Sequence, residues 1–185
     1  MLSNFNQQPI ENWIDNAIEG IPMVKADKEH IYRFFKSRDY SPNSIRAILF
    51  DLRKFFAYFT TLNREPFDST RITAMDLSGF KRDLREKQRQ AIATTNRALV
   101  SVRRYLDWMV AEKILMVNPA KMVKELRRQR PVPKGLDRSQ VRRLFRELEL
   151  RNDVRSKAIF SLFFHTGCRV SDLVQAEMSD IIIAE

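Results

Sequence analysis

Apolar residues recur every three or four positions along most of the chain, and this spacing predicts a series of amphipathic helices. The longest apolar stripes lie in residues 42–60 and 92–113. Shorter stripes predict helices within residues 10–18, 24–37 and 77–84. The chain has only 4 glycines and few stretches in which polar and apolar residues alternate, so the pattern favours a mainly α fold.

Capping signals mark where several of these helices begin. Ser41 can accept a hydrogen bond from the first turn of helix 42–60, and Pro42 suits the first helical position. Thr73 and Asp76 have the spacing of a capping box, with aspartate in place of the usual glutamate. Further along, Asn118 and the proline after it start one more short helix.

Residues 136–185 form a second, mostly helical region. Asp137 can cap its first helix, and Asn152 or Asp153 starts the next. The β-branched run 179–183 predicts the beginning of a strand. A strand that begins at the end of the sequence lacks a partner, so we expect this region to be the truncated start of a larger module.

Composition divides the chain into an N-terminal extension, a helical domain, a linker and this second module, with boundaries at 1–22, 23–125, 126–135 and 136–185. Pro131 and Pro133 stop helix formation in the linker and favour an extended path. The short acidic helix of the extension is expected to pack on its own domain. Docking on a neighbouring subunit is the alternative.

The charge balance favours a polyanionic partner. The net charge is +10 and the isoelectric point is about 10.0, with arginine dominating the positive charge. Nucleic acid is the usual partner of such a chain. A membrane partner is not expected, because no long apolar run or lipidation motif occurs. The polar start of the sequence does not resemble a signal peptide, and the single cysteine excludes both an internal disulfide framework and a multi-cysteine zinc site. We therefore expect a cytoplasmic protein.

The densest positive charge lies in and after the linker. The basic residues within the linker are Arg127, Arg128, Arg130 and Lys134. An extended basic segment can follow a phosphate backbone with little preference for base sequence. The alternative is an ordinary solvated linker.

A glycine corner carries the candidate chemistry of the second module. An apolar helix runs into Thr166 and Gly167, and a second helix begins with Arg169 on its first turn. Glycine suits the sharp turn that such a corner needs. Arg169 can therefore face an anion, and Asp172, three residues later, can steer its guanidinium.

The corner Thr-Gly-Cys-Arg-Val-Ser-Asp-Leu, residues 166–173, resembles the T-G-x-R-x-[SG]-[ED]-L box of the tyrosine recombinases, the phage-integrase family. Three further elements resemble the family in the same order, namely Ser41-Pro42-Asn43-Ser44, Asn96-Arg97-Ala98-Leu99 and Asn118-Pro119-Ala120. The resemblance to the family extends over about residues 24–183. The resemblance implies a helical-bundle, SAM-like core-binding domain, a basic linker, and the helical start of an α+β catalytic domain.

The resemblance also implies a reaction and a partner. Members of the family cleave and rejoin double-stranded DNA through a 3′-phosphotyrosyl link, with no metal and no cofactor. Carried over by position, Arg169 is the first catalytic arginine, which grips the scissile phosphate, and Asp172 supports it. The full-length protein is expected to act as a homo-oligomer, a tetramer on DNA, and this fragment to be monomeric in solution. Because its four tyrosines all precede the box, the chain as printed is expected not to cleave DNA.

In the family, the helices equivalent to 42–60 and 92–111 lie across the major groove of DNA. Their polar faces offer a set of candidate DNA contacts, namely Asn43, Arg46, Thr94, Thr95, Arg97, Ser101 and Arg104. Arg103 lies closer to the apolar stripe and could instead make an intramolecular pair. Two other functions stay open: a DNA-binding regulator related to integrases that does not catalyse, and a helical interaction module whose charge is coincidental.

Overall fold

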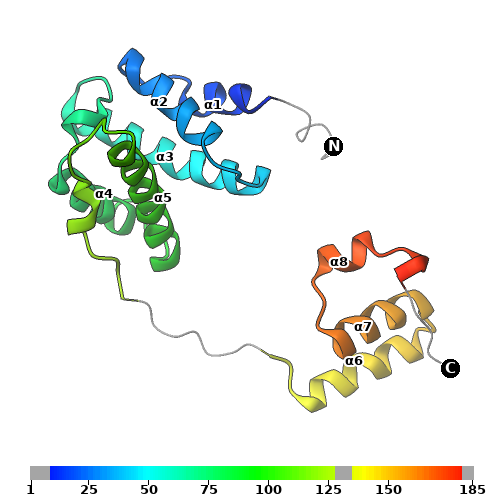
Figure 1. The fold of residues 1–185 in the computed structure, drawn as a ribbon. Helices are drawn as coiled ribbons and strands as arrows, with labels where there is room; N and C mark the ends of the chain where they lie inside the picture. The colour runs from blue at the N-terminus through cyan, green and yellow to red at the C-terminus, as the bar shows by residue number, and fades with distance from the viewer. Residues whose placement is uncertain (1–8, 128–134, 181–185) are drawn as a thin grey trace. The chain divides into compact units, whose positions relative to one another are not determined.

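Helices account for nearly all the regular structure in the computed structural model, which describes residues 9–127 and 135–180. The chain divides into two units, residues 1–129 and 130–185 (Figure 1). The predicted mainly α fold is confirmed.

Within residues 9–127, the first unit is a bundle of five α-helices with two short 3-10 helices. In chain order they are α1 (Ile10–Ile18), α2 (Lys25–Lys36), α3 (Pro42–Asn63), η2 (Ser69–Arg71), α4 (Ala74–Glu86), α5 (Ile92–Ala111) and η3 (Pro119–Met122). Helix α5 packs on α2, α3 and α4, and α1 packs on α2 and α3 (Figure 1). The two longest helices, α3 and α5, therefore make the centre of the unit.

The predicted helix starts are confirmed by the capping contacts. The Ser41 hydroxyl accepts a hydrogen bond from the Ser44 backbone N–H at 3.3 Å, and Pro42 occupies the first position of α3. The Thr73 side chain accepts from the Asp76 backbone N–H while the Asp76 carboxylate accepts from the Thr73 N–H, which completes the predicted capping box. Local sequence therefore fixes where these helices begin.

Aromatic side chains fill the core between the helices. Tyr105 of α5 lies 5.3 Å from the ring of Phe34 and 6.1 Å from that of Phe56, measured between ring centroids. Phe67, in the loop after α3, packs 4.2 Å from Phe56. All four side chains are buried. Edge-to-face and tilted packing of large rings stabilises a core through area burial and ring electrostatics.

Helix α1 packs on its own unit, as expected. Ile14 and Ile18 are buried against the bundle. The Arg53 guanidinium of α3 donates to the backbone carbonyls of Asn16, at 3.1 Å, and Ala17, at 2.7 Å. A cation at the C-terminal end of a helix satisfies carbonyls that have no partner within the helix.

The second unit contains α6 (Arg138–Leu150), α7 (Val154–Thr166), α8 (Val170–Gln175) and the 3-10 helix η4 (Met178–Asp180). Asp137 and Asp153 cap α6 and α7. Phe145 and Phe164 pack edge to face at 5.8 Å between α6 and α7. The predicted strand is wrong at its first residues, Ser179 and Asp180, because these lie in η4, and residues 181–183 fall outside the described part of the chain.

No side chain described in the second unit is fully buried. Its exposed large apolar residues are Leu136, Leu150, Val154, Phe160, Leu162, Phe164, Val170 and Val174. His165 is exposed and lies edge to face with Phe164, with ring centroids 5.2 Å apart. None of the helices described here is both long and apolar enough to cross a lipid bilayer.

Candidate nucleic-acid interface

Helix α5 presents a ridge formed by Ala93, Arg97, Val100 and Arg104, in which Val100 is half-buried and the other three residues are exposed. Arg97 and Arg104 are seven residues apart, so they lie on one face of the helix, about two turns from each other. Both side chains are exposed. Thr94, also a predicted contact, is half-buried beside this ridge.

Helix α3 borders one side of the ridge and contributes a buried acid, Asp51. The Asp51 carboxylate, which is 0% exposed, accepts hydrogen bonds from Arg97 Nη2 at 2.9 Å and from the Ser101 hydroxyl at 2.9 Å. The Arg97 side chain remains 49% exposed, so only part of its guanidinium faces the protein. One arginine of the ridge is therefore bonded to a buried residue, whereas Arg104 makes no hydrogen bond or ion pair with the described residues.

Burial and hydrogen bonding act on Asp51 in opposite directions. Burial raises the pKa of the Asp51 carboxyl because it disfavours the charged form. The Ser101 hydroxyl, the Arg97 guanidinium and the charge of Lys54 oppose this rise in pKa. Lys54 also donates to the Gln90 side chain at 3.3 Å, which adds a second polar link between α3 and the start of α5.

Two predicted contacts, Thr95 and Ser101, are not on the exposed face of α5, and their assignment as exposed DNA contacts is wrong. Thr95 is 0% exposed and its hydroxyl donates to the Ala91 carbonyl at 3.2 Å. Ser101 is buried and bonded to Asp51. Both residues lie on the side of α5 that faces the bundle, and small hydroxyl side chains can be buried there because each has a hydrogen-bond partner.

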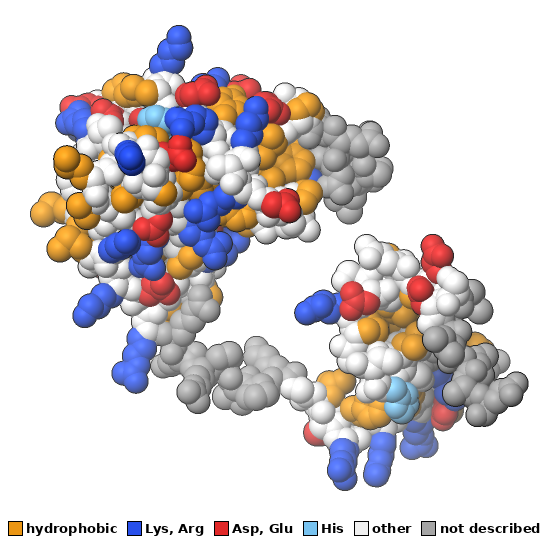
Figure 2. Space-filling model, viewed as in Figure 1, with side chains coloured by type: hydrophobic (Ala, Val, Ile, Leu, Met, Phe, Trp, Pro, Cys, Tyr) orange, Lys and Arg blue, Asp and Glu red, His pale blue; other side chains and the backbone are white. Residues whose placement is uncertain are grey.

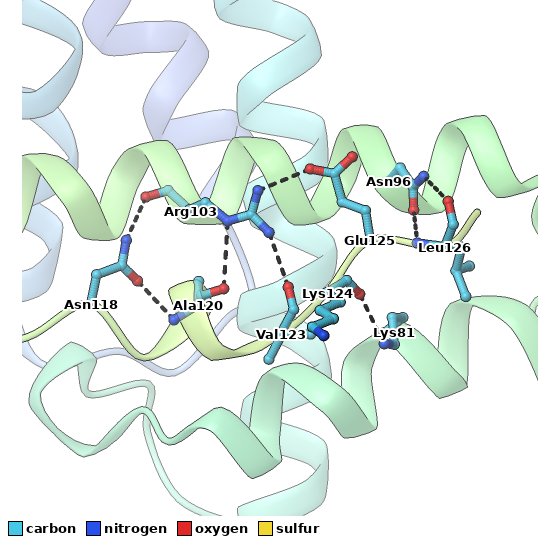
Figure 3. Close-up of polar contacts among 9 residues, drawn as sticks. All are labelled: Lys81, Asn96, Arg103, Asn118, Ala120, Val123, Lys124, Glu125 and Leu126. Carbon is cyan, nitrogen blue, oxygen red and sulfur yellow. Dashed lines mark hydrogen bonds and ion pairs between the residues drawn. The ribbon is translucent and has the colours of Figure 1, made fainter. Parts of the chain in front are cut away.

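A strap, residues 118–126, borders the other side of the ridge and runs back along α5 (Figure 3). Arg103 holds its middle: Nη2 donates to the Val123 carbonyl at 3.0 Å, Nη1 donates to the Glu125 carboxylate at 2.9 Å, and Nε reaches the Ala120 carbonyl at 3.5 Å. The intramolecular pair considered for Arg103 is therefore present. This arginine faces the strap instead of the ridge.

The ends of the strap are held by two asparagines. Asn118 caps η3 through the Ala120 N–H at 2.8 Å, and its Nδ2 donates to the Arg103 carbonyl at 3.0 Å. Asn96, which is 1% exposed, donates through Nδ2 to the Leu126 carbonyl at 2.8 Å and accepts from the Leu126 N–H at 2.9 Å (Figure 3). Lys81 of α4 donates to the Lys124 carbonyl at 3.0 Å from the side.

The end of the strap places the start of the basic linker close to the ridge. Leu126 is bonded to Asn96, the residue immediately before Arg97, and Arg127 follows as an exposed side chain. The first linker arginine therefore leaves the bundle beside the first arginine of the ridge. The other predicted linker contacts, Arg128, Arg130 and Lys134, lie outside the described residues.

Helix α3 carries the remaining predicted contacts near its start. Asn43 and Arg46 are both exposed. The Arg46 guanidinium lies 4.8 Å from the centre of the Trp13 ring on α1, within the range of a cation–π contact. Arg46 therefore also helps to hold α1, so its substitution would affect packing as well as charge.

Positive charge is distributed differently in the two units. Figure 2 shows Lys and Arg side chains interspersed with acidic ones over the visible face of the first unit. In the second unit they gather along the edge formed by α6, whose exposed arginines are Arg138, Arg142, Arg143 and Arg146 (Figure 2). Searching the described residues finds no group of three or more His, Cys, Asp or Glu side chains placed to hold a metal ion.

The glycine corner of the second unit forms as predicted. Gly167 ends α7 in the left-handed conformation, with φ +65°, and Arg169 stands at the start of α8 with an exposed side chain. Its guanidinium has no hydrogen-bond or ion-pair partner among the described residues. Asp172 does not pair with this guanidinium, contrary to the prediction: its carboxylate accepts from the Arg169 backbone N–H at 2.9 Å. A carboxylate at this position reaches the helix start more readily than the end of a long side chain.

Comparison with known proteins shows which proteins the chain resembles. Residues 29–113 match the family described as "Phage integrase, N-terminal SAM-like domain". Tyrosine recombinase XerD of Oceanobacillus iheyensis is 27% identical over 165 residues, which are 86% of this chain and 54% of that protein. Tyrosine recombinase XerC of Vibrio cholerae is 31% identical over 122 residues, which are 63% of this chain and 38% of that protein. The chain is similar to the tyrosine recombinases.

The chain spans about half the length of the tyrosine recombinases it matches, or less. A solved structure, titled "Crystal structure of XerA recombinase", aligns with a TM-score of 0.41 and 22% sequence identity, and the alignment covers 84% of this chain and 52% of that chain.

Sequence reasoning missed two residues that shape this candidate site. Asp51 was overlooked, although an acidic residue between Leu49 and Leu52 interrupts an apolar stripe and signals a buried carboxylate. Asn96 was noted as part of a motif but was given no role. No sequence signal identifies its partner, because Leu126 lies 30 residues away and is bound through its backbone.

Proposed function

We propose that residues 23–125 form a DNA-binding domain of a tyrosine recombinase, which places the α5 ridge and the start of α3 against double-stranded DNA. The match of residues 29–113 to the integrase SAM-like domain carries the proposal. The exposure of Arg97 and Arg104 on one helix face supports it, because cationic side chains in a row are suited to a duplex.

The linker extends this contact. We place residues 126–135 along the phosphate backbone, where an arginine-rich segment binds with little sequence preference. The position of Arg127 beside the ridge supports this placement. We also propose that the reaction uses no metal or cofactor. The proposed location of the protein is the cytoplasm.

Residues 136–185 are proposed to be the N-terminal part of the catalytic domain. In the longer protein, Arg169 binds the scissile phosphate during formation of the 3′-phosphotyrosyl link, and Asp172 supports it by fixing its backbone. The exposed and unengaged guanidinium of Arg169 among the described residues supports the first role, and the 2.9 Å contact supports the second. A homotetramer on DNA is the proposed active assembly.

Duplex binding tests the first proposal. The binding of this chain to a random-sequence DNA duplex is measured by fluorescence anisotropy between about 50 and 200 mM salt, and affinity should fall steeply. Arg104→Ala should reduce the slope of log affinity against log salt by about 0.9, the value for one lost phosphate contact. Arg71→Ala, which removes an exposed arginine on η2, should leave the slope unchanged. Binding that does not depend on salt would favour the helical interaction module instead.

Substitution of Arg169 tests the catalytic proposal in a protein that carries this chain with the rest of the catalytic domain. Arg169→Ala should lower the rate of covalent protein–DNA adduct formation by about 100-fold or more, because a fixed charge at the transition state is lost. Duplex affinity should change little. A parent protein that binds DNA but forms no adduct even with Arg169 intact would favour the non-catalytic regulator.

A further inference from the structure

Arg97 and Arg104 share one ridge but differ in how they are held. Arg97 donates to the buried Asp51 carboxylate at 2.9 Å, and Ser101 fixes the other carboxylate oxygen at 2.9 Å. Arg104 is exposed and makes no ion pair or hydrogen bond with the described residues. Two arginines two turns apart are therefore presented to the same partner in different ways.

The contact with Asp51 fixes the orientation of the Arg97 guanidinium. The carboxylate is 0% exposed, and it accepts a hydrogen bond from a buried hydroxyl on the same helix as Arg97. A guanidinium has five N–H donors in a rigid plane, and Asp51 takes only one of them. With the side chain 49% exposed, the remaining donors are free to face an external acceptor in a fixed direction.

The same contact weakens the electrostatic attraction between Arg97 and a phosphate group. The negative charge of Asp51 lies within hydrogen-bond distance, so the pair attracts a polyanion less than an unpaired arginine does. The pair still holds the N–H donors of Arg97 in a defined orientation. A planar, pre-oriented pair of donors matches the O6 and N7 acceptors that guanine presents in the major groove.

We propose that Arg97, held by Asp51 and Ser101, is a specificity-determining residue that reads a guanine edge in the major groove, whereas Arg104 contacts phosphate. Asp51 acts through Arg97 as a positioning residue. The inference deepens the proposed function and rests on duplex binding by this chain.

The test is selection of binding sites from a pool of duplexes with a random centre, using the full 185-residue chain, followed by affinity measurements on the selected duplex. Arg97→Ala should abolish the preference at one guanine position and reduce discrimination there by about 5- to 150-fold. The salt slope should change little. Arg104→Ala should keep the preference and lower the slope by about 0.9.

Two further variants separate positioning from folding. Arg97→Lys keeps the charge but loses the planar donor pair, so it should lose the guanine preference as Arg97→Ala does. Asp51→Asn should weaken the preference in the wild-type background and have no further effect in the Arg97→Ala background, with Ser101→Ala as a milder second variant. Thermal unfolding of each variant shows whether the fold is retained.

The outcomes are distinct. If the wild-type chain does not bind duplex DNA, the proposed function fails and the inference fails with it. If the chain binds without sequence preference, or Arg97→Ala keeps the preference at every position while lowering the salt slope by about one, only the inference is overturned.

Discussion

Replacing Asn96 with aspartate should release the strap from α5. The Asn96 amide both donates to and accepts from the Leu126 backbone, at 2.8 and 2.9 Å, inside a site where Asn96 is 1% exposed. Asn96→Ala removes both bonds, which at about 1 kcal/mol net each gives a loss near 2 kcal/mol. Asn96→Asp keeps the accepted bond but turns a carboxylate oxygen toward the Leu126 carbonyl and buries a charge, so about 3–5 kcal/mol is expected at neutral pH.

The pH dependence of Asn96→Asp provides an internal check. Burial raises the pKa of the introduced carboxyl, so the loss of stability should be present at neutral pH and should diminish as the pH falls and the carboxyl regains a proton. The measurements are urea unfolding and hydrogen exchange at the Leu126 amide. Asn63→Asp is the matched control, because its amide bonds only to the Phe59 carbonyl, at 3.1 Å, near the end of α3. An Asn96→Asp protein with wild-type stability at pH 7 and a protected Leu126 amide would refute the reasoning.

Three further predictions concern single side chains. Gly167→Ala should destabilise the second unit by about 1–2 kcal/mol in urea unfolding, because Gly167 has φ +65°, whereas Gly135→Ala, in open space and without a positive φ, should not. Tyr105→Phe should leave thermal stability unchanged or raise it by up to about 1 kcal/mol, because the buried Tyr105 hydroxyl has no hydrogen-bond partner in the described structure; a clear loss would reveal a missed partner. Burial and the hydrogen bond to Asp15 raise the pKa of Tyr32 from 10.0 to about 12. The stability that Tyr32 contributes is therefore complete below pH 10 and is lost as the pH rises toward 12, and Tyr32→Phe should remove this dependence in unfolding measurements made at a series of pH values.

The sequence predicted those features of the bundle that depend on neighbouring residues. Helix starts at Ser41, Thr73 and Asp137 follow from capping chemistry within one turn of the chain, and all three contacts are present. The turn at Gly167 follows from the backbone freedom of glycine. Periodicity also identified the buried stripe of α3, because an amphipathic helix in a small domain can bury only one face.

The site was predicted less well because its contacts cross the fold. Ser101 is polar and lies four residues from Arg97, so helical spacing alone placed it on the exposed face. Its burial depends on Asp51, 50 residues earlier in the chain, and a one-dimensional pattern does not identify that partner. The contact that Asp172 makes was mispredicted for a different reason: both the backbone N–H and the guanidinium of Arg169 were possible partners, and sequence spacing does not discriminate between them.

The inward-facing guanidinium of Arg103 changes how the basic composition of this chain should be interpreted. Arg103 counts toward the net charge of +10, yet its donors are occupied by Val123, Ala120 and Glu125 within the protein. The number of counterions displaced by a duplex should therefore be smaller than the formal charge suggests. Anyone wishing to strengthen DNA affinity should introduce a lysine at an exposed neutral position such as Ala93 and leave Arg103 untouched.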